Sequence, residues 1–234
     1  MHILVINPNS TAAMTESVAV AARAAARADT TITALNPTNA PPAIQGPEDG
    51  AAALPGLYAL FEKEVLGKGG YDACIIACFD DTGLQELKRR APIPVLGIGE
   101  AAFYAAMLVG RRFSVVTTLA VSVPVIEVNI ATYGIGPRCL RVRASDVPVL
   151  DLESDKGGSS RSIAAEIERS LAEDQPDAVV LGCAGMADLA QSMSDRFAIP
   201  VIDGVAAAVA FAEALHAAGA DRWIRAGEGT GSAS

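Results

Sequence analysis

The chain has 234 residues, of which 51% are hydrophobic, and it carries a net charge of −9 at pH 7. This length suffices for one large domain or for two lobes of about a hundred residues each, and the acidic balance argues against nucleic-acid binding, which needs a basic face. No apolar run approaches the ~20 residues of a membrane span and the N-terminus lacks the basic segment of a signal peptide, so we expect a cytoplasmic protein without a membrane partner.

Short β-branched runs alternate with Ala-rich helical stretches along the chain, a pattern typical of an α/β fold. The strand runs are almost continuously apolar, as expected of parallel strands buried on both faces of a sheet. Residues 36–47 contain four prolines and are predicted to form a loop. In chain order, the pattern predicts strands at 3–7, 31–35, 73–77, 95–98, 113–117, 140–143, 178–182 and 201–202, and helices at 12–27, 48–66, 84–90, 100–109, 123–133, 160–172, 186–197 and 205–217.

One segment of the chain occurs twice. Residues 72–78 recur at 177–183, and both copies are apolar runs that end in a cysteine, Cys78 in the first and Cys183 in the second. Each copy leads through an Ile-Pro pair to a further strand, and the pattern of the N-terminal strand begins again at Phe113. The repetition indicates a duplicated half with one thiol at each matching strand end.

Two pseudo-symmetric, doubly wound lobes with mainly parallel four-stranded sheets follow from this repeat. We predict lobes at 1–98 and 99–204, and a flexible tail at 226–234. Ligands of open α/β sheets bind at the carboxyl ends of the strands, so we expect the active site in the cleft between the lobes.

The repeated cysteines each lie just before a helix, whose N-terminal amides and positive dipole end are expected to lower the thiol pKa below the free value of about 8.5. Two opposed thiols can invert a carbon acid without a cofactor, because one thiolate removes a proton from one face and the other thiol returns one to the opposite face. We therefore predict Cys78 and Cys183 as paired acid–base catalysts. Cys74 and Cys139 lack thiol partners in the repeat and are predicted to be structural. The chain shows no paired metal-ligand spacing, so no metal site is expected.

Polar turns follow the first strand of each half. Asn9 and Ser10 precede the first long helix, where either is a good N-cap, and Thr11 completes the turn. A helix N-terminus also offers free amides and hydroxyls to an oxyanion or carboxylate. Thr117 and Thr118 occupy the matching turn of the second half. These five residues are therefore predicted to contact the ligand.

Further candidate ligand contacts follow the two cysteines. Phe79 is predicted to form a wall of the site, and Asp80 to hydrogen-bond the ligand, although a carboxylate there would raise the pKa of a nearby thiol. Ala184 and Gly185 are small, so their backbone amides can approach a substrate carbonyl. Gln45 is predicted to be a lid residue, because it ends the proline-rich loop. Three other acidic residues are interpreted as N-caps of the helices that follow them: Asp81, Glu100 and Asp203.

The motifs that combine these residues are Asn7-Pro8-Asn9-Ser10-Thr11, Cys78-Phe79-Asp80-Asp81 with Gly83-Leu84, Gly97-Ile98-Gly99-Glu100-Ala101, Val115-Val116-Thr117-Thr118 and Gly182-Cys183-Ala184-Gly185-Met186. With this set the chain resembles, over nearly its whole length, the Asp/Glu/hydantoin racemase superfamily, and within it the hydantoin racemase branch. The resemblance implies Rossmann-like lobes with helix 205–217 packed back on the first lobe. It also implies a homo-oligomeric, cofactor-independent, two-base racemase that interconverts D- and L-5-monosubstituted hydantoins through an enolate.

Several alternatives stay open at this point. Allantoin is itself a 5-substituted hydantoin, so allantoin racemisation in purine breakdown is the nearest alternative. Amino-acid racemases of the superfamily typically have Cys-Asn-Thr and Cys-Thr-Glu at the two thiols, and this chain has neither. Arylmalonate decarboxylases keep only the second thiol, whereas maleate isomerases use two cysteines. A non-catalytic, two-lobed small-molecule-binding protein is an alternative from a different class, and it would not need thiols at both strand ends.

Overall fold

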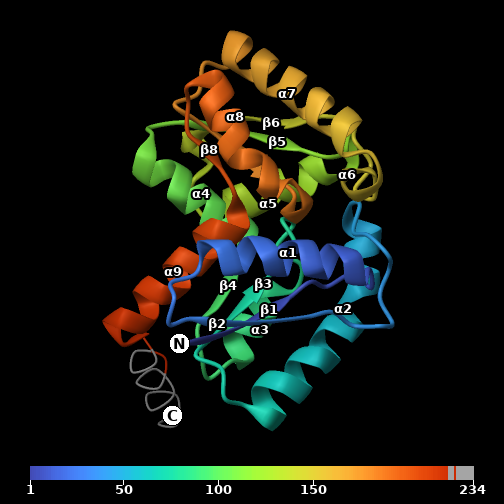
Figure 1. The fold of residues 1–234 in the computed structure, drawn as a ribbon, viewed down its shortest axis with the longest axis vertical. Helices are drawn as coiled ribbons and strands as arrows, with labels where there is room; N and C mark the ends of the chain where they lie inside the picture. The colour runs from blue at the N-terminus through green and yellow to red at the C-terminus, as the bar shows by residue number, and fades with distance from the viewer. Residues whose placement is uncertain (221–223, 225–234) are drawn as a thin grey trace.

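Two lobes lie one above the other along the long axis of the molecule (Figure 1). This computed structural model describes residues 1–220 and 224. Each lobe contains one parallel four-stranded sheet with helices packed around it. The predicted fold class, an α/β protein with two pseudo-symmetric lobes, is confirmed. The predicted flexible tail at 226–234 lies outside the described residues.

The two sheets have the same strand order. The strands span His2–Ile6 (β1), Thr31–Leu35 (β2), Ala73–Ile76 (β3), Val95–Gly97 (β4), Phe113–Thr117 (β5), Cys139–Ala144 (β6), Ala178–Gly182 (β7) and Val201–Ile202 (β8). The first sheet is ordered β2-β1-β3-β4 and the second β6-β5-β7-β8, and all pairs are parallel. The copies of the repeated segment, β3 and β7, hold equivalent inner places and are buried along their whole length. The repeat in the sequence is therefore a repeat in space.

The helices follow the predicted order, with two of the predicted segments divided. They span Ala12–Ala25 (α1), Pro47–Phe61 (α2), Leu84–Arg90 (α3), Ile98–Val109 (α4), Val123–Thr132 (α5), Asp151–Ser154 (α6), Lys156–Glu173 (α7), Ala190–Phe197 (α8) and Gly204–Ala218 (α9). A π-helical segment, Glu62–Lys68 (η1), continues α2, and a 3₁₀ segment, Ala184–Leu189 (η4), precedes α8. Apolar spacing does not distinguish these windings from an α-helix over so few residues. The sequence also missed α6, which is too short to show a period, and two 3₁₀ turns, Ala120–Ser122 (η2) and Gly136–Arg138 (η3).

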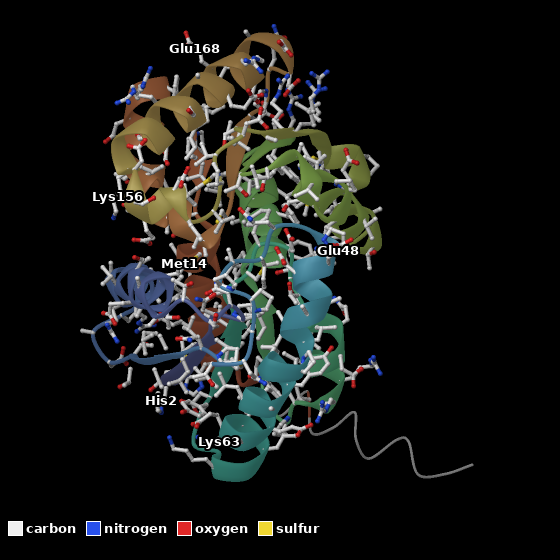
Figure 2. The ribbon with its side chains drawn as sticks, turned by 90° about the vertical axis from the view of Figure 1, so that its right-hand side faces the viewer. His2, Met14, Glu48, Lys63, Lys156 and Glu168 are labelled. Atoms are coloured by element: carbon white, nitrogen blue, oxygen red, sulfur yellow. The ribbon has the colours of Figure 1, made fainter. Side chains whose placement is uncertain are left out.

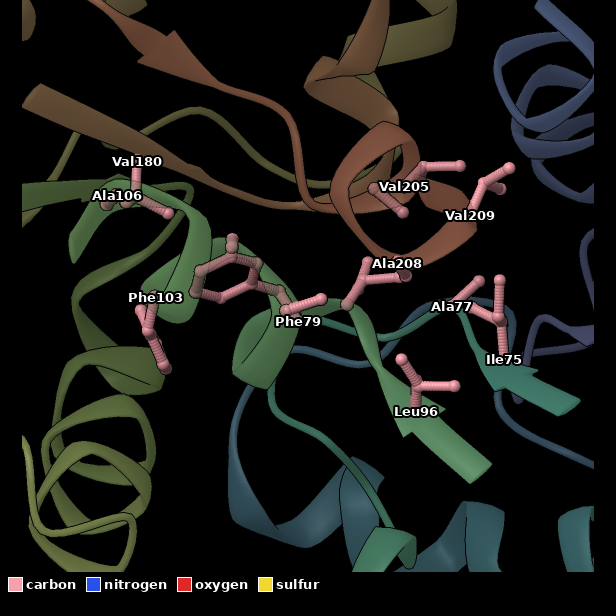
Figure 3. Close-up of a cluster of buried hydrophobic side chains, with 14 of the residues drawn as sticks. Ile75, Ala77, Phe79, Leu96, Phe103, Ala106, Val180, Val205, Ala208 and Val209 are labelled. Atoms are coloured by element: carbon pink, nitrogen blue, oxygen red, sulfur yellow. The ribbon is translucent and has the colours of Figure 1, made fainter. Parts of the chain in front are cut away.

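One apolar cluster runs through both lobes (Figure 3). It joins Ile75 of β3 to Val180 of β7 by way of Phe103 on α4 and Val205 on α9, and all four side chains are fully buried. Burying an aliphatic or aromatic side chain of this size contributes about 1.5–3 kcal/mol each. The cluster therefore holds the two sheets together on the side of α4 and α9.

Helix α9 packs against α1 and α4 (Figure 1). Asp203 caps it, because its carboxylate accepts hydrogen bonds from the amides of Val205 and Ala206, each over 2.9 Å. The predicted N-cap is thus confirmed. Gly204 lets the N-termini of α9 and α4 approach each other closely, since a Cβ on Gly204 would collide with the carbonyl oxygen of Ile98. The placing of the lobe boundaries at residues 98 and 204 stays a prediction.

An apolar side chain lies where the two lobes meet, and charged side chains lie near the two ends of the molecule. In Figure 2, Met14 lies at the level where the lobes meet, whereas Lys63 and Glu168 lie near opposite ends. Within the described ranges, none of the helices is both long and apolar enough to cross a membrane.

Candidate active site

A pocket lies between the lobes, at the carboxyl ends of four strands. Asn7 follows β1 and Cys78 comes after β3, while Thr118 follows β5 and Cys183 follows β7. The cavity volume is about 30 Å³, well below the roughly 300–1,000 Å³ of sites that hold drug-sized ligands. Both repeated thiols therefore share one cavity. Its described lining residues are Asn7, Asn9, Met14, Ile44, Ala77, Cys78, Phe79, Asp80, Thr118, Ser122, Val149, Gly182, Cys183 and Ala184.

The pocket brings together most of the residues that the sequence predicted for the site. Seven of them line it: Asn9, Cys78, Phe79, Asp80, Thr118, Cys183 and Ala184. The others lie outside the lining: Ser10, Thr11, Gln45, Thr117 and Gly185. The functional role of each of these residues stays a prediction.

The sequence missed seven lining residues. Three of them lie at strand ends, where the sequence carried a signal for them: Asn7 and Gly182 belong to the motifs quoted above, and Ala77 directly precedes Cys78. The other four come from the start of α1 and from segments that reach the pocket only through folding: Met14, Ile44, Ser122 and Val149. No local pattern marks these four, because apolar or hydroxyl side chains at such places are common in any core.

Cys78 lies on the loop between β3 and α3, and its thiol is half-buried. The Thr82 hydroxyl donates a hydrogen bond to Cys78 Sγ over 3.4 Å. Burial and then the charge of Asp80 raise the pKa of the Cys78 thiol, and they outweigh the hydrogen bonds from Thr82 and from the backbone of Asp80, which lower it. The prediction of a lowered pKa is therefore wrong for this thiol, because loss of water outweighs the local donors.

Cys183 is the N-cap of η4 and packs against Met14 and Val149. Burial raises the pKa of the Cys183 thiol to about 11, although a hydrogen bond from the backbone of Gly185 lowers it. The predicted lowering of the pKa is wrong here for the same reason as at the first thiol. Each cysteine nevertheless receives a backbone hydrogen bond from the residue two positions later.

The two thiols also influence each other. Charge on Cys183 adds to the effects that raise the pKa of Cys78, so ionising one thiol disfavours ionising the second. This coupling favours the form with one thiolate and one thiol, which a two-base reaction requires. Because the pKa of Cys78 is raised further than that of Cys183, Cys183 is expected to ionise first.

We expect alkylation of Cys183 in the free protein to accelerate as the pH rises towards about 11, because only the thiolate reacts and burial raises its pKa to that value. Iodoacetamide labelling of a Cys78→Ala variant at a series of pH values, read by mass spectrometry, measures this rate. Cys74 is fully buried and serves as the internal control that stays unlabelled. A labelling rate for Cys183 that levels off at or below a pH of about 8.5, the ordinary thiol value, would contradict this expectation.

Asp81 anchors the loop after β3 to the second lobe. Its carboxylate accepts hydrogen bonds from the amides of Gly99 (3.1 Å) and Glu100 (2.8 Å). The Tyr133 hydroxyl, at the end of α5, donates a third over 2.7 Å. Asp81 was predicted to cap α3, which follows it, but it caps α4, because the start of α4 folds beside this loop. Glu100 is likewise no cap, since its carboxylate pairs with Lys88 over 2.6 Å.

Gly97 and Gly99 allow this close approach. A Cβ on Gly97 would collide with the Asp81 carboxylate, and a Cβ on Gly99 would collide with the carbonyl oxygen of Phe79. Asp81 itself has a φ of 49°, in the left-handed region that residues other than glycine rarely adopt. The Gly-Ile-Gly motif thus explains how the turn that carries Cys78 is held in place.

The turn after β1 is fixed by side-chain hydrogen bonds. Asn9 Oδ1 accepts hydrogen bonds from Asn7 Nδ2 and from the Thr11 amide, each over 2.9 Å. The Ser10 amide and the Thr11 hydroxyl donate to carbonyl oxygens of the proline-rich loop, over 2.9 and 2.6 Å. The N-cap of α1 is Thr11, without a side-chain capping bond, so neither Asn9 nor Ser10 is the cap. Ser10 and Thr11 therefore hold this loop beside the pocket.

Thr117 and Gly185 lie behind the pocket wall. The Thr117 hydroxyl donates a hydrogen bond to the Gly182 carbonyl oxygen over 2.9 Å, which ties β5 to β7. A Cβ on Gly185 would lie 2.8 Å from Leu152 Cδ1, so this position packs tightly on the segment before α7. Both residues shape the site from outside the lining.

Gln45 joins the proline-rich loop to the second lobe. Its side-chain oxygen accepts a hydrogen bond from the backbone amide of Val149 over 3.1 Å. The backbone amide of Gln45 donates a hydrogen bond to the Asp49 carboxylate over 3.0 Å. Its neighbour Ile44 and its partner Val149 both line the pocket. Gln45 is thus placed at the edge of the pocket, and its role as a lid residue stays a prediction.

Known proteins resemble this chain over nearly its whole length. The family profile described as Asp/Glu/Hydantoin racemase matches residues 3–212. A hydantoin racemase of Rhizobium meliloti is 48% identical over 220 residues, which cover 94% of this chain and 90% of that protein. Allantoin racemase from Klebsiella pneumoniae has a TM-score of 0.90 and 41% identity, covering 94% of this chain and 89% of that one.

A second solved racemase structure matches the chain over a similar length. Allantoin racemase from Pseudomonas fluorescens has a TM-score of 0.88 and 38% identity, and the match covers 94% of this chain and 92% of that one. The family match spans both lobes and all four strand ends of the pocket. The chain therefore belongs to the Asp/Glu/hydantoin racemase family and is a racemase.

Proposed function

We propose that this racemase interconverts the D and L forms of 5-monosubstituted hydantoins by moving a proton between Cys78 and Cys183. The observation that carries the proposal is that both repeated thiols line one pocket between the lobes. The equivalent places of β3 and β7 in their sheets support an approach of the two thiols from opposite sides. The likeness to hydantoin racemases supports the substrate class.

The reaction balances with two cysteines and no other reactant. One thiolate takes the C5 proton and becomes a thiol, while the electron pair of the C5–H bond moves towards the C4 carbonyl oxygen to give an enolate. The opposite thiol then donates its proton to the other face of C5 and becomes a thiolate, as the enolate returns its electron pair to C5. The product is the other enantiomer, and the enzyme is ready for the reverse direction.

The enolate oxygen requires donors that are already oriented towards it. Thr118, Ser122 and Asn9 line the pocket, and their side chains carry hydroxyl and amide donors. The nearest acceptor of the Asn9 amide is Met14 Sδ at 3.6 Å, and a thioether is a weak acceptor. We propose that this amide, the Thr118 hydroxyl and the backbone around Ala184 stabilise the enolate.

Allantoin racemisation is the second candidate function. The specific observation in its favour is the close structural match to the two allantoin racemases, with TM-scores of 0.90 and 0.88. Allantoin has the same ring and differs from other hydantoins in its C5 substituent. The choice between the two functions therefore depends on the pocket residues that contact this substituent.

Cofactor, assembly and location complete the proposal. The scheme uses no cofactor, because the thiols supply both proton transfers. Tyr104, Leu108 and Val109 expose apolar surface on α4, with Leu108 76% exposed, and this patch favours a homo-oligomer. The cytoplasmic location stays a prediction.

Single enantiomers of 5-benzylhydantoin and allantoin, incubated with the purified protein in D2O, test the function. We expect optical rotation to decay and deuterium to enter C5 with at least one of the two compounds, because proton transfer through the enolate does both. Optical rotation and NMR follow the two processes. The compound with the faster decay identifies the preferred substrate. Constant rotation and no C5 exchange with either compound would contradict the proposed function.

A further inference from the structure

Asp80 lines the active-site pocket, and one of its carboxyl oxygens has no partner. Oδ2 is buried and accepts no hydrogen bond from the described residues. The backbone of Asp80 is held in place, since its carbonyl oxygen accepts a hydrogen bond from Asn129 Nδ2 over 2.8 Å. A fixed, buried acceptor without a partner is unfavourable unless a bound molecule supplies a donor.

The charge of the pocket restricts what this donor can belong to. Asp80 is the one acidic side chain among the described lining residues, and none of those residues is basic. Burial raises the pKa of Asp80 to about 7. A substrate carboxylate would meet this acidic group without a cation to offset the repulsion. A neutral ring with an N–H group would supply the missing donor.

Asp80 also breaks the symmetry of the repeat. The two thiols are 183 − 78 = 105 positions apart, and the same offset places Gly185 at the position equivalent to Asp80. Both residues provide a backbone hydrogen bond to their cysteine, so their local roles match except for the carboxylate. The hydantoin ring has a matching asymmetry, because C5 has N1–H on one side and the C4 carbonyl on the other.

We propose that Asp80 accepts a hydrogen bond from N1–H of the hydantoin ring and thereby selects neutral ring substrates against carboxylates. This inference rests on the proposed function. Gly185, at the equivalent position, has no side chain and therefore offers no second carboxylate to the ring. Asp81, the next residue, is no rival for this role, because three protein donors already occupy its carboxylate.

Binding measured by calorimetry tests the proposal without requiring turnover. Racemic 5-benzylhydantoin, its N1-methyl and N3-methyl derivatives, and the ring-opened carboxylate N-carbamoylphenylalanine are titrated into the wild type, Asp80→Ala and Asp80→Asn. The titrations are run about one pH unit above the pKa of about 7 of Asp80, so that its carboxyl group is mostly ionised. We expect Asp80→Ala to bind 5-benzylhydantoin about 10- to 100-fold more weakly, which is the usual effect of losing a hydrogen bond to a charged group. Asp80→Asn keeps an acceptor oxygen and is expected to recover part of this loss.

The modified ligands identify the atom that is recognised. Methylation at N1, but not at N3, is expected to weaken binding to the wild type by a similar factor. The Asp80→Ala variant is expected to be insensitive to N1 methylation, because the contact is already absent. N-carbamoylphenylalanine is expected to bind both Asp80 variants more tightly than the wild type, since the repelling charge is removed.

Asp29→Asn is the matched control, because it removes a carboxylate whose side chain is 80% exposed. It is expected to bind every ligand as the wild type does, and thermal unfolding verifies that each variant is folded. The proposal is overturned if Asp80→Ala binds 5-benzylhydantoin as tightly as the wild type, if N3 is the sensitive position, or if the wild type does not bind the hydantoin. Asp80-dependent binding without racemisation would instead refute the proposed function and leave this recognition intact.

Discussion

Cys78→Ala and Cys183→Ala are each expected to slow hydantoin racemisation about 100- to 10,000-fold, the usual effect of removing one general acid or base. The reason is that each thiol serves one face of C5, so the remaining thiol cannot complete an inversion alone. Both side chains line the same pocket, so a substrate bound there can contact both thiols. The decay of optical rotation of L-5-benzylhydantoin measures the rate for each variant.

Cys139→Ala provides the matched control. Cys139 is also half-buried, but it begins β6 and does not line the pocket. Its replacement is expected to leave the racemisation rate unchanged. Cys74 is a poorer control, because it is fully buried and its truncation would leave a cavity in the first lobe. Racemisation at the control rate by either active-site variant would rule out the two-thiol reaction.

Arg143→Met is expected to lower the free energy of unfolding by about 3–5 kcal/mol, the usual cost of removing one partner of a buried ion pair. Arg143 contacts both carboxylate oxygens of Asp174, through Nε over 2.6 Å and Nη2 over 2.7 Å. Its Nη1 donates to Glu166 over 3.1 Å. The side chains of Arg143 and Asp174 are only 5% and 3% exposed. The variant would leave the buried Asp174 carboxylate with Arg141 alone, at 3.4 Å, and this side chain is 55% exposed.

Arg141→Met is the control for this effect. Arg141 lies on the same strand and pairs with Glu173 over 3.1 Å and, at a longer 3.4 Å, with Asp174, but its side chain is 55% exposed. Exposed pairs contribute about 0–1 kcal/mol, so urea denaturation is expected to show a small change. Equal losses in the two variants would contradict the assignment of stability to the buried pair.

The contribution of the Arg143 pair is also expected to depend on pH. Burial alone would raise the pKa of Asp174, but the Arg143 guanidinium outweighs it and holds this pKa below its ordinary value. A carboxyl group with a lowered folded-state pKa stabilises the protein above its unfolded-state value of about 3.9. The difference in stability between wild type and Arg143→Met is therefore expected to shrink as the pH falls below about 4.

The repeat made the topology predictable from the sequence. Residues 72–78 and 177–183 became β3 and β7, which hold the same place in sheets of the same order. A buried parallel strand needs a continuous apolar run, and this requirement is visible in a single sequence. Superimposing the two repeated segments also predicted Cys78 and Cys183 as site residues, because the carboxyl ends of equivalent strands face the cleft.

Features that depend on distant parts of the chain were not predictable. Asp81 caps a helix that begins later in the chain, and the preceding sequence gives no sign that α4 folds beside it. The thiol pKa values were predicted in the wrong direction, because nearby amides are visible in the sequence whereas burial by both lobes is not. Val149 reaches the pocket by way of a contact with Gln45, more than a hundred residues away.

Exchange of the C5 proton in D2O, followed separately for each enantiomer in Cys78→Ala and Cys183→Ala, tests the opposed thiols most directly. The thiolate that remains can still remove the proton from the face it serves and return a deuteron to that same face. Each variant is therefore expected to exchange one enantiomer without racemising it, and the two variants are expected to prefer opposite enantiomers. Exchange of the same enantiomer by both variants would contradict the placement of the two thiols on opposite faces of the substrate.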